Sequence, residues 1–149
     1  MRVAIERVVQ HPPDRVFAVI SDPHKRPLWQ GNTSDVEVFT PGPSAVGTRW
    51  CEQTQGVGTV NAEVVALEPD SLWQEAGTAD AGEVLVSMRL RPDGDGATRV
   101  SVDVEIHLRG ARRMFESALA PMVSRQVAAN LAQLEALLEQ RGEQLQQSQ

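Results

Sequence analysis

Two side-chain amides near the C-terminal end of the sequence are placed to contact a small molecule. Gln126 and Asn130 are four residues apart and fall within or beside an apolar stripe at helical spacing, so they share one face of the predicted helix. Polar groups on such a face need hydrogen-bond partners, which a ligand carbonyl or hydroxyl, a water molecule or a strand carbonyl can supply. If the partner is a ligand, the two amides would orient it without transferring a proton.

The three tryptophans, Trp29, Trp50 and Trp73, each combine a large apolar ring with one hydrogen-bond donor. Trp29 follows a segment broken by prolines and would fill the space between a helix and a sheet. Trp50 and Glu52 share one face of a predicted strand, and Cys51 occupies the other. An inward Glu52 would be the best candidate for a functional carboxylate. With the two faces reversed, Cys51 is buried and Glu52 is solvated, and we favour this second orientation.

Catalysis by histidine, cysteine or a phosphate-binding loop is not indicated. His11 precedes a helix, His24 lies in an exposed linker, and His107 is on the polar face of a strand. A nucleophilic Cys51 would need a neighbouring base, and the sequence does not identify one. Glycine-rich phosphate loops and metal-ligand spacings are also absent from the sequence. We therefore expect no cofactor, no metal and no inward-facing histidine.

The composition limits the class of protein. With 149 residues, 41% of them hydrophobic and 23% charged, the chain can form one domain with a core. We place this domain at residues 1–141 and a polar tail at residues 142–149. The net charge of −6 argues against nucleic acid or an anionic membrane surface as a partner. No apolar run could span a bilayer and the N-terminus has no signal-peptide core, so we expect no membrane insertion and a cytoplasmic location.

The period-two segments predict an antiparallel sheet. Apolar and polar residues alternate most clearly in the pair 83–91 and 97–109, which suits strands with one buried and one solvated face. Gly, Pro, Asp or Asn bounds each of the neighbouring segments. The predicted strands are residues 3–9, 35–39, 48–54, 59–67, 72–78, 83–91 and 97–109.

Helical segments are expected after the first strand and at the end of the chain. Pro12, Pro13 and Asp14 open a helix that stops at residues 21–23, where Ser21 and Asp22 can cap a second short helix. We expect Pro27 to end that second helix, so that the two pieces bend across the end of the sheet as a brace or gate. The last stripe, residues 115–138, predicts a long helix with a kink near residues 117–121.

The order of these segments resembles the SRPBCC superfamily of START, polyketide cyclase and birch-pollen-allergen-like domains. The resemblance covers nearly the whole chain and is carried by PPDRVFAVISDP with Trp29, by GTRW, by EPDSLWQ and by NLAQLEALLEQ. It implies an α+β helix-grip fold, in which about six or seven curved antiparallel strands wrap around the C-terminal helix. It also implies a cavity for apolar ligands, with the region of Trp29 at its mouth.

Candidate walls for such a cavity come from the strands and from the long helix. Most of these residues are explained equally well as plain core, although Met88 and Met122 have adaptable side chains that suit a variable ligand. Small aliphatic residues dominate the predicted core, so either the sheet lies close to the helix or a ligand fills the space between them. The predicted ligand-binding residues are Trp29, Trp50, Glu52, Val86, Met88, Val102, Val104, Phe115, Leu119, Met122, Gln126 and Asn130.

Three hypotheses for function remain open. The leading one is a carrier or sensor, monomeric or homodimeric, that binds a small hydrophobic or aromatic molecule between the sheet and the last helix. The second is an enzyme like the polyketide cyclases and aromatases, with Glu52, Glu63 or Glu75 as acid or base. The third is a protein-interaction domain that uses residues 23–29 or the polar tail.

Overall fold

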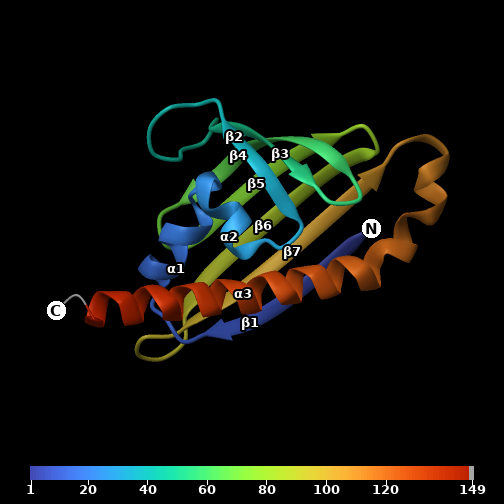
Figure 1. Ribbon diagram of the computed structural model, residues 1–149. Helices are drawn as coiled ribbons and strands as arrows, with labels where there is room; N and C mark the ends of the chain where they lie inside the picture. Colours follow the sequence, from blue (N-terminus) through green and yellow to red (C-terminus); the bar gives the residue numbers. More distant parts are fainter. Residues whose placement is uncertain (148–149) are drawn as a thin grey trace.

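Seven antiparallel strands form one sheet that curves around the long helix α3 (Figure 1). The computed structural model describes the backbone of residues 1–147 and the side chains of residues 1–142. The strand order β1-β7-β6-β5-β4-β3-β2 pairs the first strand with the last, which confirms the predicted helix-grip fold. The strands are β1 (Arg2–Val9), β2 (Thr33–Val38), β3 (Arg49–Thr54), β4 (Gly58–Glu68), β5 (Leu72–Ala79), β6 (Gly82–Pro92) and β7 (Thr98–Leu108).

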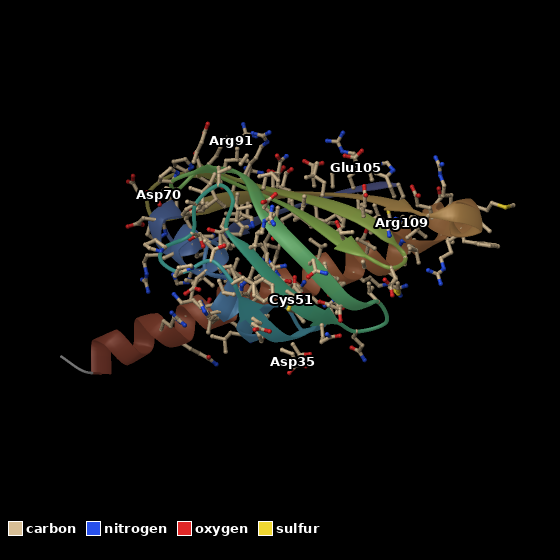
Figure 2. The ribbon with its side chains drawn as sticks, turned by 90° about the horizontal axis from the view of Figure 1, so that it is seen from above. Asp35, Cys51, Asp70, Arg91, Glu105 and Arg109 are labelled. Carbon is tan, nitrogen blue, oxygen red and sulfur yellow. The ribbon has the colours of Figure 1, made fainter. Side chains whose placement is uncertain are left out.

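The alternation of residues along each strand decides which side chains face α3. Met88 on β6 lies opposite Val102 on β7, and both are buried on the inner face of the sheet. Arg91 and Glu105, at positions of the opposite parity, project from the face that is turned away from α3 (Figure 2). The pairing register shifts within β2 and within β4, and such bulges increase the local bend of a sheet.

Two short helical pieces follow β1 and cross one end of the sheet (Figure 1). Helix α1 (Pro13–Ile20) begins with prolines, and the Asp22 side chain then caps a 3-10 turn, η1 (Pro23–Lys25), by accepting from the His24 amide at 3.1 Å. Pro27 does not end the second piece as expected. It lies in the first turn of α2 (Arg26–Trp29), where a proline loses no helical hydrogen bond.

The C-terminal helical region has two parts. A 3-10 segment, η2 (Gly110–Leu119), precedes α3 (Ala120–Gln147). The change falls at the expected break near residues 117–121, with Pro121 in the first turn of α3. Residues 142–147 of the predicted polar tail continue α3, and residues 148–149 lie outside the described part of the chain.

The hydrophobic core is concentrated where α1, α2 and the second half of α3 cover the sheet. Among the described residues, no helix is long and apolar enough to cross a membrane. The fully buried apolar side chains come from the strands, from α1 and from about two turns of α3: Val9, Val16, Ile20, Trp50, Val64, Trp73, Val100 and Leu134, with Leu131 and Leu138 nearly so.

Candidate functional site

Two repeated Trp-x-Glu sequences place an indole and a carboxylate side by side on the inner face of the sheet. Trp50 and Glu52 lie on β3, and Trp73 and Glu75 lie on β5, with β4 between them. Both indoles are fully buried, and Glu52 and Glu75 are 3% and 5% exposed. The expectation of a solvated Glu52 is therefore wrong. Burial of the large Trp50 ring selects this strand face, and the two-residue period carries Glu52 inward with it.

Arg26, the first residue of α2, lies between the two carboxylates. Its Nε and Nη2 atoms donate to the two oxygens of Glu52 at 3.3 and 3.0 Å, and its Nη1 atom donates to Glu75 at 2.7 Å. The guanidinium carbon also lies 5.1 Å from the centroid of the Trp50 ring, within range of a cation–π interaction. The Trp73 indole nitrogen donates to Glu75 at 2.9 Å. These contacts fasten α2 to two separate strands.

The charge of Arg26 is maintained by its two partners. Burial alone lowers the pKa of the guanidinium, but the attraction of Glu75 and Glu52 outweighs burial and raises this pKa above its ordinary value. Arg26 therefore stays charged at every ordinary pH, and both carboxylates are occupied as hydrogen-bond acceptors. Carboxylates held in this way position α2 against the sheet.

A groove of about 400 Å3 runs between α2 and α3 and is open to solvent. It contains both amides that were singled out in the sequence. Gln126 donates to the Asn130 side-chain oxygen at 2.8 Å, and the backbone amide of Gly31 donates to the same oxygen at 3.2 Å. The lining residues are Pro27, Leu28, Trp29, Gly31, Gln126, Ala129, Asn130 and Gln133.

Trp29 lines this groove and carries a buried hydrogen-bond donor. The side chain is only 3% exposed, and its indole nitrogen is buried with no hydrogen-bond partner among the described residues. Buried donors in native proteins are nearly always paired with a protein group or a water molecule, so this indole can donate one further hydrogen bond. The sequence identified Trp29 and the two amides separately, and the structure brings all three to one groove.

The inner face of the sheet divides into a closed half and an open half. Met88, Val102 and Val104 are buried, whereas Val86 is half-buried. Leu119 is also half-buried. Phe115 and Met122 do not lie against the sheet as expected, because they are 67% and 58% exposed. The helical stripe that included them assumed one continuous α-helix, and the 3-10 geometry of η2 changes the direction of its side chains.

A second hollow, of about 700 Å3, lies between the loop before β2 and the β3–β4 turn. It shares Gly31 with the groove between α2 and α3. Apart from Val57, its lining consists of glycine and polar residues, so it is the less suitable of the two for an apolar molecule. These residues are Gly31, Asn32, Thr33, Ser34, Gln53, Thr54, Gln55, Gly56, Val57 and Gly58.

Histidine and cysteine are placed away from the groove. His24 and His107 are exposed, but His11 is half-buried and its Nε2 atom is enclosed without a partner among the described residues, contrary to expectation. Cys51 is half-buried on β3, on the strand face opposite Trp50 (Figure 2). Within the part of the chain that the structure describes, no group of three acidic, histidine or cysteine side chains could hold a metal ion.

The sequence comparison places the chain in a family. Residues 1–139 match the profile of the family described as polyketide cyclase / dehydrase and lipid transport. The chain belongs to this family. No curated protein matches the sequence significantly.

Solved structures confirm the fold of this family member at low sequence identity. The Zhui aromatase/cyclase from Streptomyces sp. R1128 is 17% identical, with 95% of this chain and 94% of that chain covered and a TM-score of 0.76. Truncated norcoclaurine synthase from Thalictrum flavum is 18% identical, with 93% and 92% covered and a TM-score of 0.71. A Staphylococcus aureus protein of unknown function, SA2116, is 10% identical, with 96% of both chains covered and a TM-score of 0.78.

Sequence reasoning missed Arg26, and it named Glu75 only as one of three alternative carboxylates. The usable signal was the repeated Trp-x-Glu spacing, which puts a carboxylate beside a core indole twice. Two buried carboxylates require a nearby cation. The cation is Arg26, which immediately precedes Pro27 in the interrupted helical segment.

Proposed function

We propose that the protein binds a small hydrophobic or aromatic molecule that bears a hydrogen-bond acceptor, in the groove between α2 and α3. The observation that carries this proposal is that the groove brings together Trp29 and the two side-chain amides Gln126 and Asn130 beside apolar residues of α2. The groove volume of about 400 Å3 falls within the range of roughly 300–1,000 Å3 that is usual for small-molecule sites. Membership of a family described by cyclase, dehydrase and lipid-transport activities supports a ligand-binding role.

The open half of the inner face supplies further apolar surface between the sheet and α3, outside the lining of the groove. Val84, Val86 and Ile106 on the strands and Val123 and Val127 on α3 are only partly buried, although they pack against the core. A ligand that extends from the groove to these side chains would remove this surface from water, which contributes about 25 cal/mol for each Å2 buried. Gln126 and Asn130 would then orient its polar end.

Binding is favoured over catalysis because the site offers no free acid or base. The two inward carboxylates, Glu52 and Glu75, are both held by Arg26. We propose a carrier or sensor and keep a cyclase-like activity as the alternative, whose substrate would occupy the same groove. Replacement of Glu52 by Gln would leave turnover unchanged if that carboxylate is purely structural.

The test uses two probes that differ only in an acceptor, naphthalene and acetylnaphthalene. Both should raise the midpoint of thermal unfolding, and acetylnaphthalene should bind more tightly because its carbonyl can accept from Trp29. In Trp29→Phe the ratio of the two affinities, acetylnaphthalene over naphthalene, should fall roughly fivefold, because one neutral hydrogen bond contributes about 1 kcal/mol. Phe39→Leu, at an exposed loop residue, is the matched control.

Two results would contradict the proposal. One is the absence of any thermal shift with these and a broad set of apolar probes, combined with no small molecule in solvent extracts of the purified protein. The other is an unchanged carbonyl preference in Trp29→Phe, which would remove the indole from the site.

A further inference from the structure

The segment that joins the sheet to α3 has an unusual exposed surface. Met114 and Phe115 in η2 are 83% and 67% exposed, and Met122 in the first turn of α3 is 58% exposed. Large apolar side chains exposed to this degree in one short segment mark a surface that meets another apolar phase. This part of the chain lies at the end of the molecule remote from α1, beyond the sheet (Figure 1).

The same segment is strongly basic in an acidic protein. Residues 109–125 contain four arginines and one glutamate, whereas the rest of the chain has ten basic and nineteen acidic residues. Arg112 and Arg113 have no salt bridge or hydrogen bond among the described residues, and both are exposed. Arg125 donates only to the backbone oxygen of Pro121, at 3.3 Å.

The single acidic residue of this segment is paired with groups outside the segment. Glu116 accepts from the amino group of Met1 and from the Leu108 amide, the latter at 3.0 Å. The bond to the Met1 amino group is the largest influence on this carboxyl and lowers the pKa of Glu116. The negative charge is therefore neutralised within the protein, and the outer surface of η2 presents arginines beside apolar side chains.

We propose that this surface, here called the η2 patch (Arg112, Arg113, Met114, Phe115, Met122 and Arg125), docks the protein on an anionic phospholipid bilayer. The arginines would contact phosphate groups, and the apolar side chains would enter the boundary between headgroups and acyl chains. The net charge of −6 opposes this for the molecule as a whole. The patch concentrates positive charge at one end, so the acidic remainder can point away from the membrane.

A bilayer fits the patch better than an acidic protein does. Met114 and Phe115 stand out from the surface and line neither of the two hollows described above. A protein partner would need a pocket shaped to receive both side chains, whereas an acyl-chain boundary accepts protruding apolar groups of any shape. Membrane binding by the η2 patch does not depend on the proposed ligand groove, because no residue of the η2 patch lines that groove.

The experiment measures cosedimentation of the full chain with lipid vesicles. We expect binding to vesicles of phosphatidylglycerol and phosphatidylcholine in equal parts, little binding to phosphatidylcholine alone, and a decline with added salt. Arg112→Gln with Arg113→Gln should weaken partitioning roughly thirty-fold, because each arginine near an anionic surface contributes about 1 kcal/mol. Met114→Ser with Phe115→Ser should also weaken it while the salt dependence remains.

Matched controls carry the same changes elsewhere on the surface. Arg89→Gln with Arg91→Gln removes two exposed arginines from the outer face of β6, and Phe39→Ser with Val46→Ser removes two exposed apolar residues from a loop. Both control proteins should bind like the wild type. The proposal is overturned by equal binding to both vesicle types, by no binding to either, or by equal losses in control and patch variants. Retention on immobilised polyglutamate without vesicle binding would assign the patch to an acidic protein instead.

Discussion

The guanidinium of Arg26 balances charge that the strand pattern forces into the interior. Glu52 and Glu75 follow core tryptophans by two residues, and each would be buried without a counter-charge if Arg26 were absent. Removing one partner of a buried ion pair costs about 3–5 kcal/mol, whereas neutralising all partners together costs far less. At this scale one side chain determines whether α2 stays on the sheet.

The substitution Arg26→Met should lower the free energy of unfolding by about 3–5 kcal/mol, because it leaves two carboxylates buried without a cation. Urea denaturation followed by circular dichroism measures the loss. The triple variant Arg26→Met, Glu52→Gln, Glu75→Gln is the matched control and should recover most of the stability. A triple variant that is no more stable than Arg26→Met would show that the cluster acts through packing and not through charge.

At the scale of elements, the strands were predictable and the joints between helices were not. The alternation of Val100 and Val102 with polar neighbours identifies β7 unaided, because burial of one sheet face imposes a period of two on the sequence. No comparable period distinguishes the 3-10 form of η2 from an α-helix, so Phe115 was assigned to the wrong surface. Arg26 was missed for a related reason, since its partners are distant in sequence and only the folded chain brings them together.

The contact between β1 and α3 should make stability depend on pH. Arg7 donates to Glu135 at 2.8 Å and the Gln10 amide donates to it at 2.9 Å. Burial raises the pKa of Glu135, but these two hydrogen bonds outweigh burial and the pKa lies below the ordinary 4.5. The stabilisation is therefore complete above pH 4.5 and is lost as the pH falls through the lower, folded-state value.

Glu135→Gln should unfold more easily than the wild type at neutral pH by about 2 kcal/mol, the value of hydrogen bonds to a charged group. The difference should shrink as the pH is lowered below 4.5. Thermal unfolding across a pH series checks both statements. Glu139→Gln, at an exposed position one turn along α3, is the control and should change little. A constant difference at all pH values would rule out the ionic contribution.

The start of β6 depends on a glycine, because the strand packs closely against the end of β7 there. A Cβ atom at Gly82 would lie 2.2 Å from the backbone oxygen of His107 and 2.8 Å from the Cα of Leu108. Backbone atoms cannot rotate away, so Gly82→Ala should cost about 3 kcal/mol of unfolding free energy. In contrast, Gly142→Ala should stabilise α3 by up to about 1 kcal/mol, because the nearest atom, on the flexible Arg15 side chain, is 3.7 Å away. Chemical denaturation of the two variants should shift in opposite directions.

At the scale of the whole molecule, packing is uneven along the sheet. The end covered by α1 and α2 holds the indoles and the ion cluster, whereas the end near η2 retains half-buried valines and the exposed η2 patch. Regions with few buried apolar contacts open more easily than the core does. The family membership and the confirmed fold fit this arrangement, and the identity of the guest depends on side chains that the fold does not fix.

A larger side chain at the open end should test where a ligand lies. Val86→Phe fills space next to half-buried valines, so it should abolish the thermal shift produced by naphthalene while leaving the unliganded protein folded. Val57→Phe makes the same change at the other hollow and should keep the shift. The reverse outcome, with the shift lost only in Val57→Phe, would place the ligand between β2 and the β3–β4 turn.

Three tryptophans and no tyrosine make indole the dominant source of intrinsic fluorescence in this chain, since the three phenylalanines emit only weakly. Two of these fluorophores, Trp50 and Trp73, have ring centroids 6.1 Å apart and adjoin the carboxylates that hold α2. The third, Trp29, belongs to α2 itself. Any displacement of α2 therefore alters the surroundings of all three tryptophans at once. The intrinsic fluorescence of the unlabelled protein should change with that movement.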